Sequence, residues 1–137
     1  MKRGPRKKVG SEYIAGRLRN ARDFHKAAQD QMVLADKGNN CSPAVGTMVT
    51  AAIAYGDTLT ASRRGEINQQ DHRTASTLLR EAFGNALPNE QERRLRQLLG
   101  TKDEAQYGAR AIRYAEAMNL LAELDAFARW AEDQLRG

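Results

Sequence analysis

The sequence predicts an all-α protein, folded as an antiparallel up-and-down bundle of four to five helices. Alanine and leucine supply most of the hydrophobic surface, and aromatic residues are only 6% of the 137 residues, whereas a β-sandwich needs more β-branched and aromatic side chains. Apolar residues also recur every three to four positions along each long segment, which places them on one face of a helix. No segment shows the alternation expected of a strand, so we expect no sheet.

The chain length favours one domain. We expect residues 1–10 to form a basic, flexible N-terminal arm and residues 11–137 to form a single helical domain. The only cysteine, Cys41, excludes a disulfide framework within one chain.

The first half of the domain predicts two long helices. The first is expected over residues 11–37, with Gly38 in the left-handed conformation that often follows a helix. The second begins at Ser42, which is followed by a proline suited to the first helical turn, and it runs to Arg64 before Gly65. Small residues fill this second helix and make it apolar on most faces, so we predict that it is the buried central helix.

The second half predicts three further helices. After a polar connector, one helix would begin at Asp71 and end at Gly84. The next is expected over residues 89–107, continuous or slightly bent near Thr101. The last is expected over residues 111–135 and is rich in alanine.

The basic charge is concentrated at the N-terminus. The chain carries a net charge of +5, but residues 1–22 alone carry +7, which leaves −2 for residues 23–137. Such an arm can neutralise phosphates without reading sequence, whereas the alternative is a solvated tail that aids solubility. The candidate nucleic-acid-binding residues are Lys2, Arg3, Arg6, Lys7, Lys8, Arg19 and Arg22. For the two arginines of the first helix, the alternative is a solvated helix face.

No signal for secretion or membrane insertion is expected. No apolar stretch follows the basic N-terminal residues, as a secretory signal requires. The longest uncharged run, residues 38–56, is interrupted by glycine and proline and its helical part is too short to span a bilayer. We therefore expect a cytoplasmic protein without membrane contact.

The two histidines have different expected roles. His25 lies in the apolar stripe of the first helix and is interpreted as a packing residue. His72 follows Asp71 at the expected start of a helix, where the helix dipole disfavours a protonated imidazole, so it is a candidate neutral base; the alternative is a surface residue at the helix end. The two histidines are far apart in the sequence, and no dinucleotide or P-loop motif is present, so we expect neither a metal site nor a cofactor.

The order of these features resembles the HEPN domains (higher eukaryotes and prokaryotes nucleotide-binding), in particular their short bacterial single-domain forms. The resemblance covers roughly residues 11–135. It is carried by the small-residue run from Ala44 to Asp57, the Gln70-Asp71-His72 stretch, and the segment from Leu98 to Gly108 before the alanine-rich last helix. It implies a four- to five-helix bundle that is usually a two-fold dimer, and many family members are metal-independent ribonucleases in toxin–antitoxin or phage-defence systems.

The family signature is an arginine followed, four to six residues later, by a histidine at the dimer cleft. By position, Lys102 matches the arginine and Tyr107 matches the histidine, so the chain departs from the signature at both positions. Tyrosine has a reference pKa of about 10 and is a poor general base near neutral pH, and lysine lacks the bidentate fork of arginine. His72 is then the candidate for a missing imidazole, and the candidate catalytic residues are Lys102, Tyr107 and His72.

Two functions remain open at this point. The first is a HEPN-like helical homodimer that binds nucleic acid, with RNA favoured, or a cognate protein partner, and does so without catalysis. The alternative is a metal-independent endoribonuclease toxin or phage-defence effector. The dimer is also expected because the apolar helix faces of a thin bundle need more burial than one chain supplies.

Overall fold

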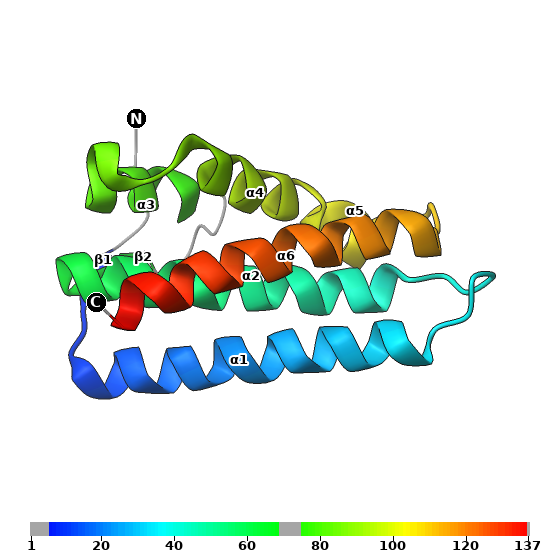
Figure 1. The fold of residues 1–137 in the computed structure, drawn as a ribbon, viewed down its shortest axis with the longest axis horizontal. Helices are drawn as coiled ribbons and strands as arrows, with labels where there is room; N and C mark the ends of the chain where they lie inside the picture. The colour runs from blue at the N-terminus through cyan, green and yellow to red at the C-terminus, as the bar shows by residue number, and fades with distance from the viewer. Residues whose placement is uncertain (1–5, 69–74, 137) are drawn as a thin grey trace.

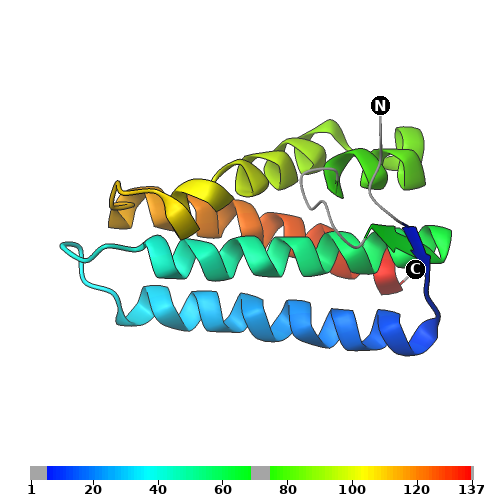
Figure 2. The same ribbon diagram turned by 180° about the vertical axis from the view of Figure 1, so that it is seen from behind.

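The structure, a computed structural model, describes residues 6–68 and 75–136, and the fold is all-α as predicted. Three long helices, α1 (Ser11–Leu34), α2 (Ser42–Arg64) and α6 (Tyr114–Arg136), lie side by side, with α1 antiparallel to the other two (Figure 1). The shorter helices lie on the side of α2 away from α1, as Figure 2 also shows. They are α3 (Ala75–Phe83), α4 (Asn89–Gly100) and α5 (Lys102–Tyr107), and a 3-10 turn, Gly84–Ala86, connects α3 to α4.

The predicted central helix is confirmed. Helix α2 packs against α1, α3, α4, α5 and α6, and 15 of its 23 residues are buried. Small side chains allow this, because they let neighbouring helices approach from several directions. Ala52 and Ala54 are fully buried, and a Cβ at Gly56 would lie 3.8 Å from the Leu95 side chain of α4. The buried Thr58 hydroxyl donates to the carbonyl of Ala54 at 2.7 Å, so this polar group is satisfied within the helix.

A short two-stranded sheet is the main difference from the sequence-based expectation. Strand β1 (Arg6–Lys8) pairs antiparallel with β2 (Glu66–Asn68), and the amide of Val9 continues the ladder by donating to Gly65 at 2.8 Å. Residues 6–8 of the expected flexible arm are thus paired with the segment that follows α2, while residues 1–5 lie outside the described residues. Strands of three residues are too short to show an alternating pattern in the sequence.

The glycine signals for helix ends are confirmed at two positions and wrong at a third. Gly65 and Gly84 adopt positive φ angles of 68° and 56°, directly after α2 and α3. Helix α1 instead ends at Leu34 rather than at residue 37, and Gly38 is not left-handed. The reason is a local side-chain bond: the Asn39 side-chain Oδ1 accepts from the Asp36 amide at 2.7 Å and closes the turn after α1.

The second half of the chain differs from the prediction in its helix limits. The expected helix over residues 89–107 is divided at Thr101 into α4 and α5, and the Thr101 hydroxyl donates to the Leu98 carbonyl at 2.7 Å. The expected start of a helix at Asp71 lies outside the described residues, whose next helix begins at Ala75. The last helix begins three residues later than predicted, at Tyr114.

Two glycine-to-alanine substitutions are expected to change stability in opposite directions. Gly65→Ala should lower the free energy of unfolding by about 1 kcal/mol, because a residue with a Cβ is strained at positive φ. Gly16→Ala should raise it by about 0.5–1 kcal/mol, because Gly16 lies inside α1 and a Cβ there meets nothing within 4 Å. Urea denaturation measures both, and a shift of the same sign for the two variants would contradict the assigned backbone conformations.

Candidate functional site

Two of the three candidate catalytic residues, Lys102 and Tyr107, lie at the two ends of α5. Lys102 begins this helix and is partly exposed, and Tyr107 ends it with 79% of its surface exposed. Neither side chain makes a hydrogen bond or ion pair with a described residue. Helix α5 therefore presents both side chains to solvent rather than to the core, and the third candidate, His72, lies outside the described residues.

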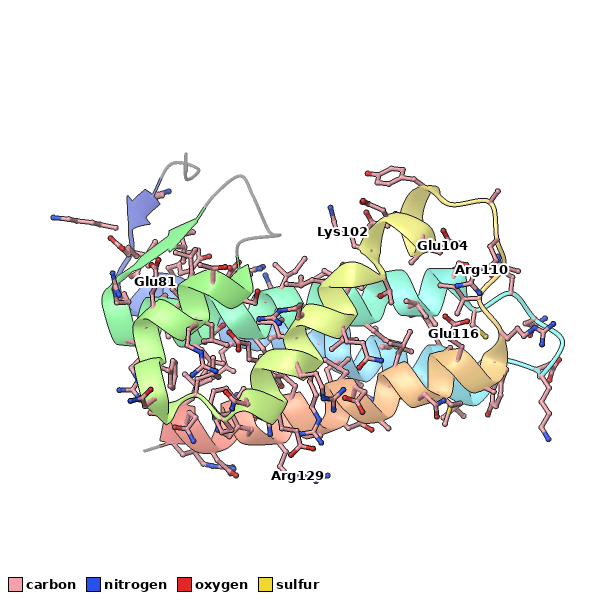
Figure 3. The ribbon with its side chains drawn as sticks, turned by 90° about the horizontal axis from the view of Figure 1, so that it is seen from above. Glu81, Lys102, Glu104, Arg110, Glu116 and Arg129 are labelled. Carbon is pink, nitrogen blue, oxygen red and sulfur yellow. The ribbon has the colours of Figure 1, made fainter. Side chains whose placement is uncertain are left out.

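A surface cluster that the sequence did not predict holds α5 against the start of α6. The Arg110 guanidinium lies 3.2 Å from a Glu104 oxygen and donates to Glu116 at 3.0 Å and 3.2 Å, as Figure 3 shows. Lys102 projects from α5 away from this cluster in the same view. The Arg110 hydrogen bonds lower the pKa of Glu116. A Cβ at Gly108 would lie 2.7 Å from the main-chain carbonyl oxygen of Glu104, so glycine is favoured where the chain leaves α5.

The basic N-terminal residues are only partly described. The side chains of Lys7 and Lys8 are exposed on β1, and Arg19 is exposed on α1. No ion pair joins any of these three to a carboxylate of residues 6–68 or 75–136. Lys2 and Arg3 lie outside the described residues, and of Arg6 only the backbone, within β1, is described.

Most other arginines of the bundle are matched by carboxylates. The ion pairs are Arg17–Asp57, Arg22–Glu132, Arg64–Glu66, Arg80–Glu92, Arg93–Glu123, Arg94–Glu90, Arg96–Glu92 and Arg136–Asp133. Arg63 stacks instead on the Phe83 ring, 4.1 Å from its centroid. Lys7, Lys8 and Arg19 thus differ from most arginines of the bundle in having no such partner among the described residues.

Arg22 was predicted to bind nucleic acid, but its guanidinium is already engaged. It donates to both carboxylate oxygens of Glu132 at 2.8 Å and 2.7 Å, and Glu132 also accepts from the buried Tyr55 hydroxyl at 3.0 Å. The hydrogen bonds from Arg22 lower the pKa of Glu132, whereas burial and the adjacent carboxylate raise the pKa of Tyr55. This interaction ties α1 to α2 and α6.

His25 packs as predicted and also forms a polar contact that the sequence did not reveal. Its Nε2 lies 2.6 Å from Asp125 of α6, its side chain is 16% exposed, and its ring meets Tyr55 edge-on at 6.3 Å. These groups border a shallow cavity of about 380 Å³ between α1, α2 and α6. The polar groups of this cavity mostly satisfy one another, so we interpret them as an interhelical network.

The predicted functional residues that lie within residues 6–68 and 75–136 do not form one site. The basic strand β1 pairs next to the C-terminal end of α2, whereas α5 lies towards the other end (Figures 1 and 2). Helix α2 is about 35 Å long at a rise of about 1.5 Å per residue. The surface around Lys7 and Lys8 and the surface around Lys102 and Tyr107 are therefore separate.

Comparison with known proteins gives no matching family model and no similar curated protein. Among the described residues, no group of three or more histidine, cysteine, aspartate or glutamate side chains is placed to hold a metal ion. None of the described helices is long and apolar enough to cross a membrane.

Replacing Glu132 should show how much the ion pair with Arg22 stabilises the fold. The folded-state pKa of Glu132 is lowered below its ordinary 4.5, so its stabilising contribution is present above that pH and is lost as the pH falls through the folded-state pKa. Glu132→Gln should therefore lower the free energy of unfolding by about 2 kcal/mol at neutral pH. The difference in the free energy of unfolding between Glu132→Gln and the wild type should become smaller at acidic pH.

The control for this measurement is Asp133→Asn, which removes a neighbouring but 60% exposed carboxylate paired with Arg136. Such exposed pairs contribute at most about 1 kcal/mol. Denaturation at several pH values measures both variants. Equal losses for the two, or a Glu132→Gln loss that stays constant into acid, would contradict the role given to Glu132.

Proposed function

We propose that the protein is a non-catalytic, HEPN-like RNA-binding module that contacts phosphates through the basic segment of β1 and the start of α1. The observation that carries this proposal is the set of exposed cations, Lys7, Lys8 and Arg19, without carboxylate partners among the described residues. Cations already matched by carboxylates must break those pairs to bind phosphate, whereas these three need not. Binding of this kind is insensitive to sequence and weakens as salt rises.

The pairing of β1 with β2 supports the proposal. The strand contact fixes the backbone of Lys7 and Lys8 against the domain, and the Val9 amide extends this contact. A pre-ordered cationic segment loses less conformational entropy on binding than a free tail. The further basic residues Lys2 and Arg3 precede this segment and would lengthen the phosphate-contacting surface.

We also propose that the protein acts as a homodimer, since two copies would double the cationic surface available to one RNA strand. Large apolar side chains remain exposed among the described residues, and such residues favour association. They are Phe24, Val33, Leu34, Tyr107 and Met118.

The ribonuclease alternative is favoured by one observation, the exposure of Lys102 and Tyr107 on α5. It requires a group that exchanges a proton near neutral pH. The described histidine, His25, is bound to Asp125 between α1 and α6, whereas α5 packs on α2 and α4. The non-catalytic function is favoured because the chain has Tyr107 where the signature has histidine, and tyrosine is a poor general base near neutral pH.

Neutralising the β1 lysines should weaken RNA binding. Lys7→Gln combined with Lys8→Gln is expected to reduce affinity for a labelled oligouridylate and to reduce the slope of log affinity against log salt by about 1.4, at about 0.7 for each single-strand phosphate contact. Fluorescence anisotropy at several salt concentrations measures both. Lys26→Gln is the control, because Lys26 already pairs with Asp30 on α1. An unchanged slope in the double variant would show that β1 does not contact the phosphates.

RNA should remain intact when it is incubated with the purified protein in EDTA. The proposed function gives Lys102 and Tyr107 no chemical step. RNA should therefore stay equally intact with the wild type and with Lys102→Ala combined with Tyr107→Phe. The melting temperature of the protein should change little, because both side chains project from the core. Gel analysis of mixed RNA is the measurement. Cleavage by the wild type that the double variant lacks would contradict the non-catalytic proposal in favour of the ribonuclease.

A further inference from the structure

Two loops at the α5 end of the bundle form a groove that the proposed RNA contact does not use. One loop follows α1 and the other joins α5 to α6, and both lie at the same end of the molecule (Figures 1 and 2). The groove has a volume of about 780 Å³. Its lining includes Lys37, Gly38, Asn40, Ala111, Ile112 and Arg113.

The base of the groove is fixed by hydrogen bonds between the two loops. The Asn40 side-chain oxygen accepts from the amide of Ser42 at 3.0 Å and from that of Ile112 at 3.1 Å. The Cys41 amide donates to the Ile112 carbonyl at 2.8 Å, and the Ile112 side chain is 1% exposed. The groove is therefore formed before any partner arrives, which reduces the ordering cost of binding.

The outer main chain of both loops keeps unused hydrogen-bonding groups. Lys37, Gly38 and Ala111 make no main-chain hydrogen bond with another described residue. In the free protein such groups face water, and an extended peptide satisfies both the N–H donors and the carbonyl acceptors. A phosphate group supplies acceptors alone, so by itself it pairs only with the N–H donors.

The charges around the groove favour an acidic occupant. Lys37 and Arg113 line it, and neither forms an ion pair with a described carboxylate. The two carboxylates of the neighbouring surface cluster, Glu104 and Glu116, are engaged by Arg110. Apolar residues also line the groove, including the exposed Ala111, and they are suited to small aliphatic side chains.

We propose that this groove binds an extended acidic peptide segment of a partner protein, with carboxylates at Lys37 and Arg113 and small aliphatic side chains between them. The peptide main chain pairs with the loop main chain, and the side chains provide the charge match. This surface lies away from β1, so peptide binding at the groove and RNA binding at β1 are separable properties.

A fluorescein-labelled peptide that alternates glutamate and valine tests the proposal by anisotropy. The wild type should bind it saturably and should bind a glutamine–valine peptide much more weakly. Lys37→Glu combined with Arg113→Glu should weaken binding at least about tenfold, since it replaces attraction with repulsion. Ala111→Trp, which fills the groove at an exposed position, should weaken it without a change of charge.

The matched control is Lys26→Glu combined with Arg129→Glu, which makes the same change of net charge on α1 and α6 outside the groove. It should leave peptide affinity unchanged, and all variants should keep the wild-type melting temperature within a few degrees. Absence of peptide binding, or equal weakening by the control, would overturn the proposal. A third outcome is that the wild type does not bind the peptide and that Lys37→Glu combined with Arg113→Glu loses oligouridylate binding. That outcome would overturn the proposal and assign the groove to nucleic acid.

Discussion

The small side chains of α2 are the constraint on which the rest of the structure depends. A central helix can accept neighbours on nearly every side only if its own side chains leave room, and buried alanines such as Ala52 and Ala54 provide that room. The dispersion contacts come from larger buried residues of α2 itself, such as Met48 and Leu59, and of the surrounding helices, including Leu95 next to Gly56. A bulky substitution on α2 would therefore displace several helices at once.

The two ends of α2 give the molecule two different surfaces. At its C-terminal end, the left-handed Gly65 turns the chain into β2, and β2 fixes the cations of β1. At its N-terminal end, Asn40 fixes the loop before α2 to Ile112, and the open groove lies over this contact. Both candidate surfaces are identified by cations without carboxylate partners among the described residues. Most arginines elsewhere on the bundle form ion pairs with carboxylates.

Local signals explain why much of the fold was predictable. The buried character of α2 and the ends of two helices at Gly65 and Gly84 follow from residues adjacent in the sequence, so periodicity and glycine chemistry were sufficient. The early end of α1 was missed, because the Asn39 side chain competes with the helix there. The sheet was missed because pairing between residues near 7 and near 67 has no local signature.

The candidate sites were less predictable for the same reason. Composition identified the basic segment, but it could not show that Arg22 is engaged by Glu132, 110 residues further along the chain. The exposure of Tyr107 and the groove over Ile112 also depend on packing that no short motif encodes. The proposal that RNA binds at β1 and the start of α1 is tested most directly by an NMR titration of the labelled protein with oligouridylate. The account predicts amide shifts at Lys7, Lys8 and Arg19, and shifts confined to α5 and the loop that follows it would contradict it.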